Sequence, residues 1–323
     1  MRRFSRVLLS LGFLGLAGFH MPFASAQSSS SPITIVVPYP PGGSADILAR
    51  SIGQKLGERL KQTVIVENKP GAGTAIGSRF VSDSPPDGHT LLLGTVSSHA
   101  INPAMSKVGY DPIRDFAVVA PIASIPFVLV ARQDSPYKTL SDVIAAAKQK
   151  PQAIGYASAG PGTSNHLAGE MLASATQTKL MHVPYRGSAP ALADVVAGHV
   201  PLMFDLQATA VPNIRQGKLR ALAVSSLERS ALLPDVPTVA ESGAPGFEVS
   251  AWFALLAPAK VPADVIKRLG TEVTVVMESP EMIQRLRDLG GTPDRRSASA
   301  FSDYMKDEVK KYTEVVKSAG LAP

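Results

Sequence analysis

The sequence has no cysteine, one tryptophan and few aromatic residues, which make up 6% of its 323 residues. Without cysteine there are no disulfides, no thiolate metal sites and no cysteine nucleophile. After the N-terminal region, no segment approaches 18 uninterrupted apolar residues, so a later membrane span is not expected. Lysine and arginine do not gather into tracts, and this excludes the basic stripe that nucleic acids require.

The N-terminus has the features of an export signal. A basic start precedes an apolar run at 7–19, and small residues follow, ending at Ala26. This pattern predicts a signal peptide over 1–26, cleaved after Ala26, and an exported mature protein. Removing its three arginines lowers the net charge from +6 to +3, which mildly favours an anionic small molecule.

Strand-like and helix-like segments alternate along the mature chain. The strands are continuous apolar or β-branched runs, as a parallel sheet covered on both faces requires, so the predicted class is α/β. Strands are predicted at 33–38, 63–67, 90–94, 127–132, 153–157, 180–184, 200–204, 219–224 and 250–256. Helices are predicted at 44–60, 73–82, 98–105, from Ser141, and at 164–175, 189–197, 208–216, 263–278, 280–289 and 298–318. Residues 234–246 read as a loop around a short helix.

About 300 residues with this alternation fit two lobes better than one. We predict one lobe from 27–127 and 251–323 and a second lobe from 128–250. The chain would cross between them near 125–130 and 248–253. A monomer is expected.

Two turns share one pattern, in which a strand leads through glycine and proline into a helix that begins with small polar residues. They span 40–46 and 160–166. The first N–H groups of a helix lack intrahelical partners and carry partial positive charge, so such turns can bind anions. Each turn could instead be an ordinary connection, in which Ser44 caps the first helix and Asp46 complements its dipole. As a pair they predict a cleft that holds an acidic ligand from both sides.

Other polar residues at strand ends could join this cleft. Asp205 ends a buried strand, where it could bind a ligand hydroxyl or ammonium or cap the next helix. Arg186 could supply a fixed cation, although a surface charge is the commoner role. The candidate ligand-binding residues are Tyr39, Pro40, Gly42, Gly43, Ser44, Asp46, Thr95, Ser97, Gly162, Thr163, Ser164, Asn165, His166 and Asp205.

Two enzyme classes stand as alternatives. An exported hydrolase would use Ser158 or Ser164 with a histidine, but the glycines around Ser158 do not match the nucleophile-elbow spacing. A dinucleotide-dependent enzyme would use the glycine turn 71–77, where close packing of a helix start is the stronger interpretation. The histidine spacing predicts no metal site. We therefore expect no catalytic residue, cofactor or metal.

Six motifs, in order along the mature chain, resemble the Bug family of periplasmic receptors of tripartite tricarboxylate transporters. They are VPYPPGG at 37–43 with Asp46, VENKPGAG at 66–73, PDGHTL at 86–91, GTSNHL at 162–167, VPYRG at 183–187 and GKLRALA at 217–223. Thr74 stands where the family often has glycine.

The resemblance implies a two-lobed flytrap of the type II periplasmic-binding-protein fold, with a ligand cleft between the lobes. It implies a small carboxylate ligand, held through main-chain amides and waters by loops 40–46 and 162–166. The implied partners are the membrane subunits of the transporter. An orphan receptor used in sensing is the alternative role.

Overall fold

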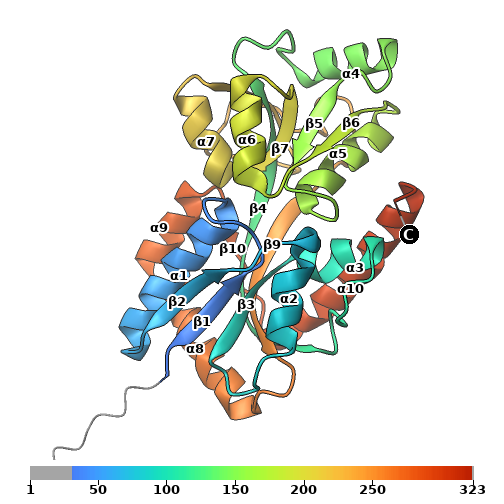
Figure 1. Cartoon of the computed structure of the whole chain (residues 1–323). Helices are drawn as coiled ribbons and strands as arrows, with labels where there is room; N and C mark the ends of the chain where they lie inside the picture. The colour runs from blue at the N-terminus through green and yellow to red at the C-terminus, as the bar shows by residue number, and fades with distance from the viewer. Residues whose placement is uncertain (1–30, 322–323) are drawn as a thin grey trace, which may run out of the picture. The chain divides into compact units, whose positions relative to one another are not determined.

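One long strand, β4 (Phe116–Arg132), joins the two halves of the fold. The computed structural model describes residues 31–321. Residues 116–126 of β4 pair with β9 (Ser250–Pro258), and residues 127–131 pair with β7 (Leu202–Leu206). Figure 1 shows β4 and β9 running between the two halves. We call the half that holds β9 lobe 1 and the half that holds β7 lobe 2.

Lobe 1 is a sheet with the strand order β2-β1-β3-β9-β4, and β10 pairs with β4. Helices α1 and α8 contact each other on one side of it, while α10 packs on η2 and α3. Its elements are β1 (Ile33–Val37), α1 (Ser44–Leu60), β2 (Val64–Asn68), η1 (Ala72–Thr74), α2 (Ala75–Ser82), β3 (Thr90–Thr95), η2 (Ser97–Ile101), α3 (Asn102–Met105), α8 (Ala263–Glu278), α9 (Pro280–Asp288), β10 (Thr292–Pro293) and α10 (Ala298–Ser318).

Lobe 2 continues the sheet through β4 in the order β4-β7-β5-β6, and β8 also pairs with β4. Alternate residues of β4 enter different apolar clusters, Val128 and Val130 in one and Leu129 in the other, because successive side chains of a strand face opposite sides. Its remaining elements are α4 (Leu140–Gln149), β5 (Gly155–Ser158), α5 (Ser164–Ala175), β6 (Met181–Pro184), α6 (Ser188–Ala197), α7 (Gln207–Arg215) and β8 (Leu219–Val224).

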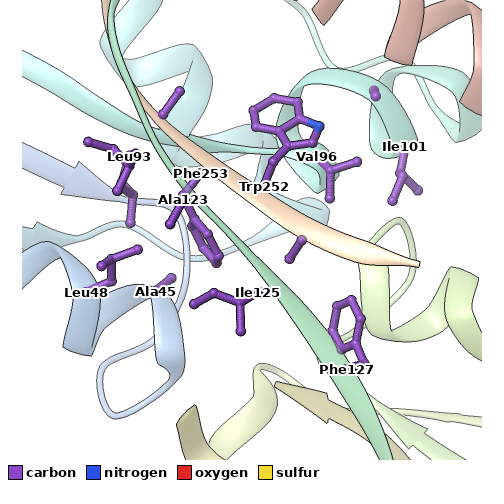
Figure 2. Close-up of a cluster of buried hydrophobic side chains, with 14 of the residues drawn as sticks. Ala45, Leu48, Leu93, Val96, Ile101, Ala123, Ile125, Phe127, Trp252 and Phe253 are labelled. Carbon is purple, nitrogen blue, oxygen red and sulfur yellow. The ribbon is translucent and has the colours of Figure 1, made fainter. Parts of the chain in front are cut away.

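The core of lobe 1 surrounds the single tryptophan, Trp252 of β9, which is 2% exposed. Its ring meets Phe301 edge to face at 5.3 Å between ring centroids. The indole N–H donates to Glu308 Oε2 at 3.2 Å, which satisfies the buried donor. Figure 2 shows Trp252 and Phe253 among the apolar side chains along β4 and β9.

The structure confirms the α/β class and corrects several predicted details. The middle of the sheet is antiparallel, since β4 and β9 run against their neighbours. Both are buried on two faces, so their apolar runs look like those of parallel strands. The strand predicted at 127–132 begins at Phe116 instead. Prolines within β4 obscured it, and the ladder accommodates Pro121 by a register shift.

Three smaller corrections concern helices. Residues 234–246 form turns and one bridge to Val224, and they contain no helix. The helix predicted at 98–105 is a π-helical turn followed by the short α3, and the one predicted at 73–82 opens with the 3₁₀ turn η1.

The predicted lobe bounds, 27–127 with 251–323 and 128–250, stay a prediction. The chain passes between the sheets at Pro126/Phe127 and at Val249/Ser250. The predicted signal peptide lies outside the described residues. Within 31–321, no helix combines the length and the apolar character that a membrane crossing needs.

Replacing Phe301, which is fully buried against Trp252, should destabilise lobe 1. We expect Phe301→Ala to lower the free energy of unfolding by about 3–5 kcal/mol, because it removes buried surface and leaves a cavity. Urea unfolding followed by Trp252 fluorescence measures it. Phe80→Ala is the matched control, since Phe80 is 44% exposed and should cost less than about 1 kcal/mol. Equal losses would contradict this packing.

Candidate functional site

The turn between β1 and α1 is held in place by Asp46. Its carboxylate accepts the Gly42 N–H at 3.1 Å, the Arg50 Nε–H at 3.0 Å and Asn68 Nδ2–H at 3.0 Å. Burial raises the Asp46 pKa, but these hydrogen bonds outweigh it and hold the pKa below its ordinary value. Asn68 also donates to the Tyr39 carbonyl at 3.0 Å. Asp46 therefore fixes the conformation of the turn through these hydrogen bonds.

Helix α1 begins with an extended Gly43 as its N-cap and has no side-chain cap. Ser44 is therefore the first helical residue, not the cap that the sequence suggested. Its hydroxyl hydrogen-bonds to Thr209 Oγ1 of lobe 2 at 3.3 Å. The first intrahelical bond runs from Ile47 N to Gly43 O, so the preceding N–H groups have no helical acceptor.

The second turn leads from β5 into α5, and its N-terminus is capped from the other lobe. Ser97 Oγ, at the start of η2 in lobe 1, accepts the Ser164 N–H at 3.0 Å and lies 3.3 Å from Ser164 Oγ. The Asn165 side chain is fixed within lobe 2, where it donates to the Phe204 carbonyl at 2.7 Å. The two predicted ligand turns thus face the same space between the lobes.

Glycines permit the close approach of the lobes. A Cβ on Gly73 of lobe 1 would lie 2.5 Å from the Pro161 carbonyl oxygen of lobe 2. A Cβ on Gly162 of lobe 2 would lie 2.5 Å from Asn102 Oδ1 of lobe 1, and Gly162 also has a φ of +76°. Only residues without a side chain fit both places. The described structure is therefore a closed arrangement of the lobes.

Two adjoining pockets lie between the lobes and share Tyr39 and Ala159 as walls. The inner pocket, of about 30 Å³, has room for about two water molecules. It is lined by Tyr39, Gly43, Ser44, Ala45, Thr95, Ala159, Ser164, Asn165, Ser188, Asp205, Leu206, Ala251 and Phe253. The outer pocket, of about 460 Å³, is lined by 38–40, 70–74, 159–161, Thr163 and 185–187.

The structure brings most of the predicted binding residues to these pockets. Tyr39, Gly43, Ser44, Thr95, Ser164, Asn165 and Asp205 line the inner one, and Pro40 and Thr163 line the outer one with Tyr39. Gly42, Asp46, Ser97, Gly162 and His166 line neither and support the turns or contact the other lobe. Arg186 lines the outer pocket. Contact of each with a ligand stays a prediction. The sequence analysis missed Ala251, Phe253 and Thr209, since no motif marks them.

The only carboxylate side chain that lines the inner pocket, among the described residues, belongs to Asp205, at the end of β7. Its side chain is buried, and Thr209 Oγ1 donates to Oδ2 at 2.6 Å. Burial raises the pKa of Asp205 to about 7, although hydrogen bonds from Thr209 and the Leu206 N–H act against the rise.

A serine and a histidine are close together beneath the second turn. Ser158 Oγ lies 2.6 Å from His182 Nε2, so the pair that a hydrolase would need is present. Ser158 is fully buried, however, and accepts the Gly160 N–H at 3.0 Å. The His182 ring stacks on His166 at 4.0 Å between centroids. Neither Ser158 nor His182 lines the pockets between the lobes, which makes the pair part of the support for α5.

The glycine turn 71–77 packs closely, as favoured above. A Cβ on Gly77 would lie 2.6 Å from the Lys69 carbonyl oxygen, and one on Gly71 would lie 2.4 Å from the Ile76 side chain.

The described part of the chain has no group of three or more histidine, aspartate or glutamate side chains that could hold a metal ion.

The fold defines a two-lobed solute-binding protein, and the two predicted ligand turns lie at its lobe interface. The family model for the tripartite tricarboxylate transporter family receptor matches residues 48–321. The chain belongs to this family, which confirms the resemblance.

Curated relatives cover nearly the whole chain. A UPF0065 protein in the tcbD-tcbE intergenic region of Pseudomonas sp. (strain P51) is 40% identical over 288 residues, 89% of this chain and 86% of that protein. Protein BugT of Bordetella pertussis is 33% identical over 319 residues and covers 98% of both chains.

Solved structures agree with this fold. R. palustris Rpa4515 with adipate superposes with a TM-score of 0.87 at 34% identity, covering 91% of this chain and 99% of that one. MatC from Rhodopseudomonas palustris with bound malate gives 0.84 at 33% identity, covering 88% and 98%.

Adding a methyl group at Gly162 should hold the lobes apart, because its Cβ would overlap Asn102. We expect Gly162→Ala to increase the radius of gyration measured by small-angle X-ray scattering. Gly217→Ala is the matched control, since Gly217 also has a positive φ of +68° but no heavy atom within 4 Å of the added Cβ. An unchanged radius in Gly162→Ala, or an equal increase in both variants, would contradict the role of Gly162 at the interface.

Acid should destabilise the support beneath α5. Burial lowers the pKa of both His166 and His182 to about 4 from an ordinary 6.5, so the unfolded chain binds their protons more tightly. Their stabilisation is complete above pH 6.5 and is lost as the pH falls toward 4. His182→Gln keeps a hydrogen-bonding group near Ser158. It should reduce the slope of the melting temperature against pH between pH 4 and pH 6.5. The same slope in both proteins would count against this assignment.

Proposed function

We propose that this protein is a periplasmic receptor that captures a small carboxylate between its lobes and delivers it to the membrane subunits of a tripartite tricarboxylate transporter. The observation that carries the proposal is that the N-termini of α1 and α5 line one inner pocket from opposite lobes. Both helix ends present N–H groups and partial positive charge. Family membership and the relatives solved with adipate and malate support a carboxylate as the ligand.

The sizes of the pockets suggest how a ligand is divided between them. The inner pocket has room for a carboxylate group or about two waters, and the rest of the ligand would extend past Tyr39 into the outer pocket. Hydroxyls of Ser44, Ser164 and Ser188 would hydrogen-bond to the carboxylate directly or through water. The ligand contacts both lobes, so it stabilises the closed arrangement, and differential affinity of this kind is what closure requires.

Further parts of the proposal concern the whole protein. We propose that it is exported with cleavage after Ala26, works as a monomer, opens and closes about the β4 and β9 crossings, and transforms no substrate. A receptor used in sensing would have the same site. Growth of a deletion strain on the bound acid distinguishes transport from sensing.

A thermal-shift panel of succinate, malate, adipate, citrate, aspartate and benzoate tests the proposal. An acid present at 100 times its dissociation constant stabilises the folded state by about 2.7 kcal/mol, so at least one should raise the melting temperature. If none of these acids changed the melting temperature, a small carboxylate would be refuted as the ligand class.

Gly43→Ala tests the placement of the site, because its Cβ would lie 2.7 Å from Ser188 Oγ in the closed arrangement. We expect a smaller ligand-induced shift in Gly43→Ala and recovery when Ser188→Ala is added. The Ser188→Ala single variant completes the cycle and separates the clash from a lost ligand contact. Ligand shifts that are additive across the cycle would place binding elsewhere.

A further inference from the structure

The inner pocket places an acid where an anionic ligand is expected. Asp205 lines the same pocket as the first residues of α1 and α5, and the cavity is only about 30 Å³. Any carboxylate group bound there lies close to the Asp205 carboxyl group. Two ionised carboxylates in one small site repel each other, so one of them tends to keep a proton.

No cation balances this second negative charge. Among residues 31–321, no lysine, arginine or histidine lines the inner pocket. Arg50 of α1 is engaged with Asp46, and Arg186 lies along the outer pocket. His166 of α5 stacks on His182, and its pKa of about 4 leaves it neutral near pH 7. Tyr39 is neutral as well, because burial raises its pKa above the ordinary value.

The hydrogen bonds around Asp205 suit either protonation state. When the carboxyl group is ionised, Thr209 donates its single hydroxyl proton to Oδ2 and can accept one from Ser44. When it is neutral with its proton on Oδ1, Oδ2 still accepts a hydrogen bond from Thr209. The proton on Oδ1 can then be donated to a ligand, and no group must move far.

We propose that Asp205 is a ligand-binding residue that takes up a proton when the lobes close on a carboxylate, and that its neutral carboxyl group donates a hydrogen bond to the ligand. The inference rests on the proposed function and assigns a protonation state to that site. Burial already raises the pKa of Asp205 to about 7, and a bound anion would raise it further.

Proton uptake has a direct thermodynamic signature. Above pH 7, binding should consume close to one proton per ligand, and affinity should fall about tenfold for each pH unit. Isothermal titration calorimetry at pH 8 in phosphate and in Tris measures the uptake, because the two buffers differ in ionisation enthalpy. The probe is the acid that gives the largest thermal shift in the panel above, with malate and adipate titrated alongside.

Asp205→Asn is the informative variant, since an amide has nearly the same shape, donates a hydrogen bond and carries no charge. We expect it to bind the probe with no proton uptake and with an affinity that stays constant between pH 6 and 8. Ser164→Ala serves as the comparison, because it removes a pocket hydroxyl but should keep the uptake. Uptake that persists unchanged in Asp205→Asn, or is missing in the wild type, would overturn the assignment.

An ionised Asp205 that binds a ligand ammonium gives a different result. Aspartate would then bind the wild type without proton uptake and would lose affinity in Asp205→Asn, and this outcome also overturns the proposal. If Asp205→Asn does not fold, carbon-13 NMR of the labelled wild-type aspartates decides, since the Asp205 pKa must rise on binding. Failure of the whole panel would refute the proposed ligand class, whereas binding without uptake refutes only this inference.

Discussion

The closed arrangement depends on a hydrogen bond that one lobe supplies to a helix end of the other. Ser97 of lobe 1 accepts the Ser164 N–H at the start of α5 in lobe 2. Helix α5 has no side-chain cap of its own, because Thr163 turns back to the Gly160 carbonyl oxygen. A helix end without a local cap needs an acceptor from elsewhere. Closure supplies it here, so the conformation of the lobes and the chemistry of the pocket are linked through one backbone group.

The two strands that pass between the lobes, β4 and β9, are compatible with this hydrogen bond across the interface. Each of β4 and β9 is part of the lobe 1 sheet, and β4 continues into the lobe 2 sheet without a loop between. Because β4 continues between the sheets, each sheet can keep its own ladder during the opening and closing that we propose. The glycines at the interface then decide how far closure goes, because Gly73 and Gly162 let the two backbones meet with no side chain between them. Strand continuity and small residues together place the two predicted ligand turns at one interface between the lobes.

Helix N-termini and hydroxyl groups line the inner pocket, and this composition has a consequence for charge. Helix ends offer only partial positive charge, which leaves a buried carboxyl group such as Asp205 without a full counter-charge. In a site built this way, a proton is the simplest available cation. Burial likewise keeps His166 of α5 and its neighbour His182 neutral, so the turn 160–166 rests on uncharged side chains at neutral pH.

Local signals in the sequence determined the α/β class, most helix positions and the positions of the glycine turns 40–46 and 160–166, since these depend on hydrophobic runs, glycine and capping residues close together in the chain. Chain length and family motifs together indicated the two-lobed fold. The antiparallel centre of the sheet and the early start of β4 at Phe116 were not predictable, because prolines masked the strand and burial on both faces looks the same in either orientation. Only the tertiary structure decided which groups meet across the interface. Ser44 with Thr209, Ser97 with Ser164 and Ser158 with His182 are 24 to 165 residues apart, and no local pattern encodes contacts that arise when separate lobes and strands are brought together.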